Sequence, residues 1–252
     1  MIDKTVIDAR AAVAGIPDGS TVMIGGFGRA GQPVELIDAL IEQGAADLTI
    51  VNNNAGNGDT GLAALLATGR VRKIVCSFPR QHDSWVFDGL YREGKVELEL
   101  VPQGNLAERI RAAGAGVGAF FSPTGVGTLL VEGKETREID GRTYVLEYPI
   151  AADYALVSAL AADRWGNLVY RGTARNFGPI MATAATTTIV QADEIVPLGA
   201  LDPEAVVTPG IFVDRVVAVG QRAWLDGGRF VGGVDIDGRA TAAAAIDAEG
   251  DR

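Results

Sequence analysis

Short apolar runs rich in β-branched residues alternate with longer segments of helix length along the first part of the chain. The runs are Thr21–Ile24, Leu48–Asn52, Lys73–Ser77 and Val96–Val101. Apolar runs separated in this way are typical of βαβ units, in which the strands pair in parallel and the helices cover the sheet. The pattern therefore predicts an α/β fold with a mainly parallel sheet flanked by helices.

Glycine and proline residues mark the ends of these predicted elements. Pro33 suits the first position of a helix that follows the turn at 25–31. Gly44, Gly69 and Gly94 fall where the residue just after a helix is expected. Both observations support the assignment of βαβ units.

The rhythm changes in the second half of the chain. Glu135–Ile139 and Arg142–Leu146 alternate around Asp140-Gly141, a dipeptide favoured in two-residue hairpins. We expect the sheet to gain antiparallel strands here. Further on, Trp165-Gly166-Asn167 predicts a turn, and Asn176 is a candidate N-cap for a short helix that follows it.

Length and composition are those of a folded globular protein. The chain has 252 residues, of which 48% are hydrophobic and 21% are charged, close to ordinary globular usage. One large domain is predicted over residues 1–220. Residues 221–252 are rich in Gly, Ala and Asp and are predicted to form a C-terminal extension, whose order the sequence does not determine.

Charge and hydropathy exclude two classes of partner. The net charge of -10, without a cluster of Lys and Arg, argues against binding to nucleic acid. No stretch approaches the roughly 18 uninterrupted apolar residues that indicate a membrane span. The N-terminus lacks the pattern of a secretory signal, and a single cysteine excludes an internal disulfide. We therefore expect a cytoplasmic protein.

A glycine-rich loop follows the first predicted strand. In Gly25-Gly26-Phe27-Gly28-Arg29-Ala30-Gly31, the backbone amides and the following helix dipole could face a phosphate or carboxylate. The loop also fits a dinucleotide fingerprint, but Asn52-Asn53-Asn54 stands where the acidic residue of that fingerprint is expected. The alternative is a tight turn whose glycines only permit close packing.

Gln103 and two asparagines are candidate polar residues of a site. Gln103 lies between a strand and a helix, at the edge where open α/β sheets bind ligands, so that its amide could donate to an oxyanion. A turn residue that bonds to nearby backbone is the alternative. Asn53 and Asn54 could likewise line a pocket or form a turn.

The remaining candidates do not form a complete catalytic site. His82 is the only histidine and Cys76 the only cysteine, and neither has the spacing of a catalytic triad or a metal site. We expect His82 at the surface or at a cap, Cys76 buried, and no metal site. No carboxylate stands in a context that marks it as a nucleophile.

Several ordered blocks are more specific than any single loop. They are Gly25-Gly26-Phe27-Gly28 with Gly31 and Pro33, Asn53-Asn54-Ala55-Gly56, Pro102-Gln103-Gly104 with Leu106-Ala107-Glu108-Arg109-Ile110, Thr124-Gly125 with Gly127-Thr128, and Ala174-Arg175-Asn176-Phe177. Through these blocks, from about Ile2 to Val219, the chain resembles the alpha (A) subunits of class I coenzyme A-transferases that act on 3-oxoacids. Three further blocks resemble 3-oxoadipate CoA-transferase alpha subunits more closely: Cys76-Ser77-Phe78-Pro79-Arg80, Lys134 to Gly141 and Thr208 to Val213.

The resemblance implies a ping-pong transfer of CoA from succinyl-CoA to a 3-oxoacid, either 3-oxoadipate or acetoacetate. The nucleophilic glutamate would belong to a separate B subunit, in an α2β2 assembly. Residues 25–31 would form the coenzyme A-binding loop, and Gln103 would support the oxyanion. Asn53 and Asn54 are candidate substrate contacts from their position alone, outside what the resemblance implies. No cofactor would be permanently bound, because the coenzyme A thioester is a substrate. Val126 replaces a tyrosine usual in the family, which alters one wall of the expected pocket.

Two other functions are compatible with the same residues. A sugar-phosphate isomerase-like enzyme also places anions on a glycine-rich turn, and binding of ribose 5-phosphate by the isolated chain would indicate it. A non-catalytic acyl-CoA-binding subunit would bind coenzyme A without turnover even when a B subunit is supplied.

Overall fold

The computed structural model describes residues 2–220, 224–226 and 229–231. The extension predicted over residues 221–252 lies outside the described residues, except for two short segments. These are β12 (Trp224–Asp226) and β13 (Arg229–Val231), which pair in antiparallel fashion.

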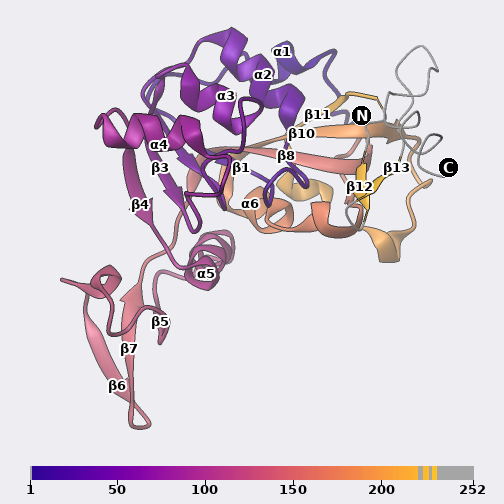
Figure 1. The fold of residues 1–252 in the computed structure, drawn as a ribbon. Helices are drawn as coiled ribbons and strands as arrows, with labels where there is room; N and C mark the ends of the chain where they lie inside the picture. Colours follow the sequence, from indigo (N-terminus) through magenta and orange to yellow (C-terminus); the bar gives the residue numbers. More distant parts are fainter. Residues whose placement is uncertain (1, 221–223, 227–228, 232–252) are drawn as a thin grey trace, which may run out of the picture.

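The predicted parallel sheet is present and organises the fold (Figure 1). Its strands follow the order β11-β10-β8-β1-β2-β3-β4 and every pair along this path is parallel, while β9 pairs antiparallel with β8. The bounds are β1 (Thr21–Ile24), β2 (Leu48–Val51), β3 (Val71–Cys76), β4 (Glu97–Leu100), β8 (Ala152–Asp163), β9 (Leu168–Val169), β10 (Ala185–Val196) and β11 (Arg215–Ala218). The α/β prediction is confirmed.

Helices cover both faces of this sheet. In Figure 1, α1 to α4 lie on one face, and α5 and α6 lie on the other. The α-helices are α1 (Ala9–Val13), α2 (Val34–Gln43), α3 (Leu62–Ala67), α4 (Trp85–Arg92), α5 (Gln103–Gly114) and α6 (Gly178–Ala184), and the 3-10 helices are η1 (Leu129–Val131), η2 (Gly172–Arg175), η3 (Pro203–Ala205) and η4 (Gly210–Phe212).

The burial of both sheet faces explains why the inner strands are mainly apolar, unlike the edge strand β4, which carries Glu97 and Glu99. In β1, Val22 and Ile24 belong to the core under α1 to α3, while Met23 belongs to the core under α5 and α6. Successive side chains of a strand point to opposite faces, so a strand covered on both sides needs mainly apolar residues. The continuous apolar runs of the sequence are therefore the signature of a doubly covered sheet.

The predicted helix boundaries hold, with one small shift. Gly44 is the C-cap of α2 in a left-handed conformation, and Gly69 and Gly94 follow α3 and α4 with positive φ. Pro33 precedes the first helical residue, Val34, and is not itself the first residue of the helix.

Asn176 does not cap α6 as predicted, because the cap position is Phe177 and no side chain caps this helix. The Nδ2 group of Asn176 donates instead to the carbonyl oxygens of Ala30 (2.9 Å) and Thr173 (2.6 Å). Asn176 therefore ties the glycine-rich loop to η2.

The predicted hairpin is present, but it does not join the main sheet. It consists of β6 (Thr136–Ile139) and β7 (Arg142–Glu147), joined by Asp140 and Gly141, both with positive φ as this tight turn requires. With β5 (Phe120–Ser122) it forms a separate three-stranded sheet in the order β5-β7-β6. Residues 120–147, here called the arm, project from the body in Figure 1.

The main sheet gains its antiparallel strand elsewhere. The predicted turn at Trp165-Gly166-Asn167 is confirmed, since it joins β8 to β9. Asp163 at the end of β8 fixes this turn by accepting hydrogen bonds from the Trp165 and Asn167 backbone amides at 2.9 and 3.1 Å.

Glu147 holds the arm to the body. Its side chain is only 3% exposed, and its carboxylate pairs with Lys134 at 2.8 Å and with Arg109 of α5 at 3.8 Å. Asn105 of α5 donates a further hydrogen bond to it at 3.2 Å. Glu147, Lys134 and Arg109 border a cavity of about 280 Å³, which Glu99 of β4 also lines. A buried carboxylate of the arm is therefore bonded to α5.

We expect Glu147→Ala to destabilise the fold by about 3 kcal/mol, because it leaves the largely buried Arg109 without one of its carboxylate partners. Chemical denaturation monitored by circular dichroism measures this loss. Glu135→Ala is the matched control, since Glu135 pairs with Arg137 where both side chains are more than half exposed, and should change stability little. Equal losses for the two variants would contradict this role of Glu147.

Candidate functional site

The order of the strands creates a single edge where ligands are expected. From β1 the chain adds β2, β3 and β4 on one side, while β8, β10 and β11 lie on the other side. In open α/β sheets, ligands bind outside the carboxyl ends of the strands, at the point where the order reverses. The glycine-rich loop follows β1 at this point, and its Gly25 N–H donates to Leu156 of β8 at 2.9 Å.

Three polar side chains from three different loops meet at this edge. Gln103, the exposed first residue of α5, donates from Nε2 to the Oδ1 atom of Asn53 at 2.7 Å. Ser77, which follows β3, donates from Oγ to the same Oδ1 atom at 2.8 Å. We call these residues the Gln103 cluster. The structure thus brings together Gln103 and Asn53, which the sequence singled out separately.

Ser77 is the member of the cluster to which sequence analysis gave no role. Serine is common in loops, so its residue type carries little signal. Its position does carry one, because Ser77 follows the end of β3 as Asn52 and Asn53 follow the end of β2. Residues just after adjacent parallel strands meet at the same edge, so this register could have identified it.

Asn53 is held firmly in this position. It is 2% exposed, and its backbone carbonyl accepts hydrogen bonds from the Ser77 and Phe78 amides at 3.1 and 3.0 Å. The preceding Asn52 also fixes the loop, since its Nδ2 donates to Ile24 of β1 at 2.5 Å. The acceptor of the Gln103 cluster is therefore attached to two neighbouring strands.

Asn54 has a different environment. It is 1% exposed, and its Oδ1 accepts from the Gly56 amide at 2.9 Å, so its side chain shapes the turn after β2. Its Nδ2 group is buried and has no hydrogen-bond partner within the described part of the chain. Of the two interpretations open for the asparagines, the turn fits Asn54 and the polar site fits Asn53.

The glycine-rich loop folds back on itself between β1 and α2. The backbones of Phe27 and Ala30 exchange two hydrogen bonds, at 3.0 and 3.2 Å. Gly31 has a φ of +73°, and a Cβ atom there would lie 2.5 Å from the carbonyl oxygen of Ala174. Gly28 has a φ of +59° and open space around it. Close packing therefore explains Gly31 but not Gly28.

Most backbone amides without a hydrogen-bond acceptor in this region lie in the glycine-rich loop, within the described residues, and not in α2. Gly26, Gly28, Arg29 and Gly31 have amides that make no backbone hydrogen bond within the described residues. In the first turn of α2, by contrast, the amide of Leu36 donates to the buried Gln191 Oε1 at 3.0 Å. An anion at this edge would consequently meet the loop amides first.

Two further blocks from the sequence analysis lie against these loops. Asn105 Nδ2 donates to Thr124 at 3.2 Å, and a Cβ on Gly125 would lie 3.8 Å from Pro102, the residue before Gln103. Val126 is 37% exposed in the same turn. This turn therefore stands beside the start of α5, where the expected pocket wall would be.

Two carboxylates near α5, the half-buried Glu99 and the buried Glu147, already have strong partners. Burial raises the pKa of Glu99, but hydrogen bonds and charge from Lys73 at 2.6 Å and Arg109 at 3.1 Å outweigh it, so its pKa lies below the usual value. Glu147 is paired as described above. Both groups are committed to ion pairs.

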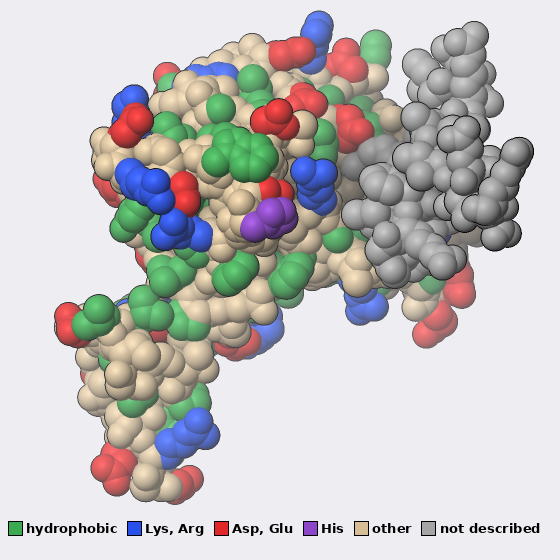
Figure 2. Space-filling view, in the orientation of Figure 1, with side chains coloured by type: hydrophobic (Ala, Val, Ile, Leu, Met, Phe, Trp, Pro, Cys, Tyr) green, Lys and Arg blue, Asp and Glu red, His purple; other side chains and the backbone are tan. Residues whose placement is uncertain are grey.

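His82 and Cys76 lie where the sequence analysis expected them. The His82 side chain is 94% exposed, and the histidine is visible at the surface in Figure 2. Cys76, at the end of β3, is fully buried. Burial raises the pKa of its thiol to about 12, which keeps it protonated and unreactive at neutral pH.

We expect thiol reagents to leave the native chain unmodified at pH 8, because a buried thiol with a raised pKa forms almost no accessible thiolate. Titration with a chromogenic disulfide should give no reaction in buffer and one thiol per chain in denaturant, since Cys76 is the only cysteine. Rapid labelling in buffer would show that the end of β3 opens.

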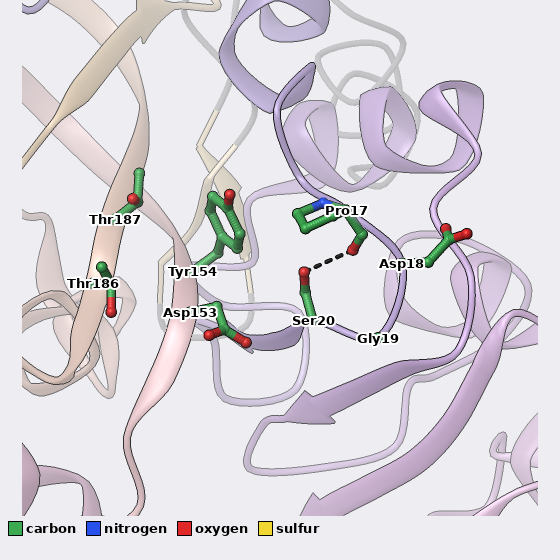
Figure 3. A pocket seen from close by; sticks show the side chains of 8 residues that line it. All are labelled: Pro17, Asp18, Gly19, Ser20, Asp153, Tyr154, Thr186 and Thr187. Carbon is green, nitrogen blue, oxygen red and sulfur yellow. Dashed lines mark hydrogen bonds between the residues drawn. The ribbon is translucent and has the colours of Figure 1, made fainter.

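A cavity of about 310 Å³ lies at the opposite edge of the sheet (Figure 3). Two of its polar side chains are already bonded: Ser20 Oγ donates to Pro17 at 2.7 Å, and Asp153 accepts from the Thr21 amide at 2.8 Å. It borders the amino ends of β1, β8 and β10, which is not the ligand-binding edge of a parallel sheet. We assign this cavity no ligand.

Two features are absent from the described residues. In these parts of the chain, no group of three or more His, Cys, Asp and Glu side chains is arranged to hold a metal ion. None of the helices described is both long enough and apolar enough to cross a bilayer.

Comparison of the sequence with known proteins gives a consistent result. The sequence model of the family described as Coenzyme A transferase matches residues 6–219. The chain is 70% identical to the A subunit of 3-oxoadipate CoA-transferase from Pseudomonas putida over 223 residues, which cover 88% of this chain and 96% of that protein. It is 50% identical to the A subunit of succinyl-CoA:3-ketoacid coenzyme A transferase from Xanthomonas campestris pv. campestris over 215 residues, covering 85% and 88%.

Solved structures agree with the sequence comparison. The fold matches an acyl-CoA transferase from Escherichia coli O157:H7, crystallised as a thioester complex with CoA, with a TM-score of 0.78 and 25% identity. The match covers 90% of this chain and 49% of that one. Glutaconate coenzyme A-transferase from Acidaminococcus fermentans shares the fold, with a TM-score of 0.76 at 21% identity over 86% of this chain and 76% of that one.

Proposed function

Because this chain belongs to the coenzyme A transferase family, we propose that it is the alpha subunit of a two-subunit enzyme that moves CoA from succinyl-CoA to a 3-oxoacid. The observation that carries the proposal is the 70% identity to the corresponding 3-oxoadipate CoA-transferase protein of Pseudomonas putida, across 96% of its length. The family match over residues 6–219 supports one domain over 1–220, with the remaining residues as an extension.

The proposed acceptor is 3-oxoadipate. The two relatives named for that substrate are 70% and 67% identical to the chain, whereas the succinyl-CoA:3-ketoacid transferase relatives are at most 50% identical among those compared. Acetoacetate is the competing acceptor, because the chain is also 50% identical to a relative named for transfer to a 3-ketoacid.

Gln103 is the proposed oxyanion donor. One N–H of its amide is used by Asn53, which leaves the second N–H of Nε2 for a ligand. Gln103 is exposed at the carboxyl edge of the sheet, so a thioester can reach it. An amide donor aimed at the carbonyl oxygen stabilises the negative charge that develops when a nucleophile attacks.

The nucleophile would come from a B subunit. Its glutamate carboxylate attacks the carbonyl carbon of succinyl-CoA and expels the CoA thiolate, which gives a mixed anhydride. The thiolate then attacks the glutamyl carbonyl and releases succinate, leaving a glutamyl-CoA thioester. The carboxylate of 3-oxoadipate attacks this thioester, and the same two steps in reverse release 3-oxoadipyl-CoA. The ion pairs of Glu99 and Glu147 make these two carboxylates of the present chain unsuited to this role.

Residues 25–31 are the proposed coenzyme A loop. Their free amides and the side chain of Arg29 can receive the anionic end of the substrate, and the exposed Phe27 offers an apolar contact. Coenzyme A enters and leaves as a substrate, with no permanently bound cofactor. An α2β2 assembly in the cytoplasm completes the proposal.

Reconstitution tests this function. The chain is co-expressed with the companion B subunit from the same organism, and the purified complex is given succinyl-CoA with 3-oxoadipate or with acetoacetate. We expect transfer by the complex, none by the isolated chain, and a higher kcat/KM for 3-oxoadipate. When the acceptor is omitted, intact mass measurement should find the CoA adduct on the companion chain.

Each outcome separates one alternative. A stable complex that binds acyl-CoA without turnover would identify a non-catalytic binding protein. Detection of the CoA adduct on the present chain would overturn the assignment of the nucleophile. Binding of ribose 5-phosphate by the isolated chain, with no transferase activity in the complex, would favour an isomerase.

A further inference from the structure

We infer that Ser77 is a positioning residue for the transferase reaction, which orients the Gln103 amide through the side chain of Asn53. The inference rests on the proposed function of Gln103 as the oxyanion donor. Its basis is a shared acceptor, since the Oδ1 atom of Asn53 receives Ser77 Oγ at 2.8 Å and Gln103 Nε2 at 2.7 Å.

The shared acceptor fixes which way the Asn53 amide faces. A carbonyl oxygen has two lone pairs, and here each accepts one hydrogen bond. Ser77 Oγ lies 2.8 Å from the Oδ1 atom of Asn53 and 3.1 Å from its backbone oxygen, so the hydroxyl contacts both oxygens of this residue. Ser77 therefore ties the Asn53 side chain to its own backbone and holds the Oδ1 atom where Gln103 donates to it.

The orientation of the Gln103 side chain depends on its hydrogen bond to Asn53. It is exposed and stands at the first position of α5, whereas Asn53 is buried and attached to two strands. The hydrogen bond to Asn53 thus attaches a long, exposed side chain to a buried residue that is held in place. Loss of that link would let the amide sample other rotamers and would lower the fraction of time that it faces the substrate carbonyl.

The Ser77 hydroxyl is separable from the fold of its loop. The backbone amides of Ser77 and Phe78 both donate to the Asn53 carbonyl, and these bonds set the path of the chain after β3. A Ser77→Ala change removes the hydroxyl, with its bonds to the Oδ1 atom and to the backbone oxygen of Asn53, and keeps the two amide bonds. The variant should therefore fold and assemble, and its effect should be seen in turnover.

A double-mutant cycle in the reconstituted complex tests the inference. Ser77→Ala should lower kcat about tenfold, as expected for one hydrogen bond, with the KM for succinyl-CoA changed less than about twofold. Ser77→Thr keeps a hydroxyl and should restore most of kcat. In a Gln103→Ala background, Ser77→Ala should have no further effect, because the amide that it orients is already absent.

Ser20→Ala is the matched control. Ser20 is also a buried hydroxyl donor, to the Pro17 carbonyl oxygen (Figure 3), but it precedes β1 and so lies at the amino edge of the sheet. It should leave kcat and KM unchanged. If Ser77→Ala lowers kcat equally with and without Gln103, the two residues act independently and the inference is wrong.

A second measurement distinguishes failure of the inference from failure of the proposed function. In a complex whose Gln103-bearing chain is labelled with ¹⁵N at glutamine side chains, the Gln103 NH2 signal is assigned by its loss in Gln103→Ala. Ser77→Ala should shift or broaden this signal, whereas Ser20→Ala should not. An inactive wild-type complex would refute the function, and an unmoved Gln103 signal would refute the role of Ser77 whatever the activity.

Discussion

Gln103→Ala lowers the kcat of the reconstituted complex by about 100- to 1,000-fold, which is the range found when one oxyanion donor is removed from a preorganised site. The KM for succinyl-CoA should change less than about threefold. The amide donates to an oxygen that becomes fully charged only in the transition state, so its loss affects turnover more than ground-state binding. Steady-state kinetics with both substrates varied measures the two effects separately.

The control for this change is Gln43→Ala. Gln43 is the last residue of α2, and its Nε2 donates to the Ile16 carbonyl oxygen at 2.8 Å. Neither residue belongs to the Gln103 cluster. Its loss should cost some stability and leave kcat unchanged. A Gln103→Ala complex with full kcat would remove the oxyanion role and leave the fold assignment intact.

The parallel sheet could be predicted from the sequence because its physical signal is local. Strands covered on both faces need mainly apolar residues, and Leu48, Ile50 and Val51 of β2 are buried, while Thr49 is partly exposed. The hairpin at Asp140-Gly141 could be predicted for a similar reason, since the turn requires two positive φ values. Its membership of a separate sheet could not, because pairing with β5 is a contact between distant segments.

Contacts between distant segments also limited how much of the candidate site could be predicted from the sequence. The position of Gln103 at a strand end could be predicted from the sequence, but its acceptor lies 50 residues away along the chain. The error at Asn176 has the same origin. A local rule assigned it to the helix that follows, whereas its amide donates to Ala30, which is 146 residues distant. Long-range partners decide side-chain roles that local propensity leaves open.

The blocks that carry the family resemblance acquire a physical meaning in the structure. Ala174 packs against Gly31, and Asn176 donates to Ala30, so the block at 174–177 supports the glycine-rich loop. The block at 124–128 stands against the start of α5. Segments far apart in sequence thus support one edge of the sheet.

Gly31→Ala should weaken both the fold and the binding of succinyl-CoA. At a φ of +73°, an L-residue costs about 1–2 kcal/mol, and the added Cβ would lie 2.5 Å from the Ala174 carbonyl oxygen. Backbone cannot yield as a flexible side chain can, so the loop must move away from η2 and lose its bond to Asn176. We expect a total cost above about 3 kcal/mol.

The Gly28→Ala variant separates the conformational cost of an L-residue at positive φ from the cost of the clash with Ala174. Gly28 lies in the same loop with a φ of +59°, and no atom lies within 4 Å of an added Cβ. The variant should lose only the conformational cost of a left-handed L-residue, about 1–2 kcal/mol. The difference predicts a Tm for Gly31→Ala about 4–8 °C below that of Gly28→Ala.

Kinetics of the same two variants connect this packing to function. If residues 25–31 hold coenzyme A, the displaced loop of Gly31→Ala should raise the KM for succinyl-CoA by about tenfold or more, while the KM for the 3-oxoacid changes less. A KM that stays unchanged despite the lower Tm would show that the loop supports the fold without contacting coenzyme A. Equal Tm values for the two variants would instead show that Ala174 yields to the added methyl group, and that close packing does not explain the glycine at position 31.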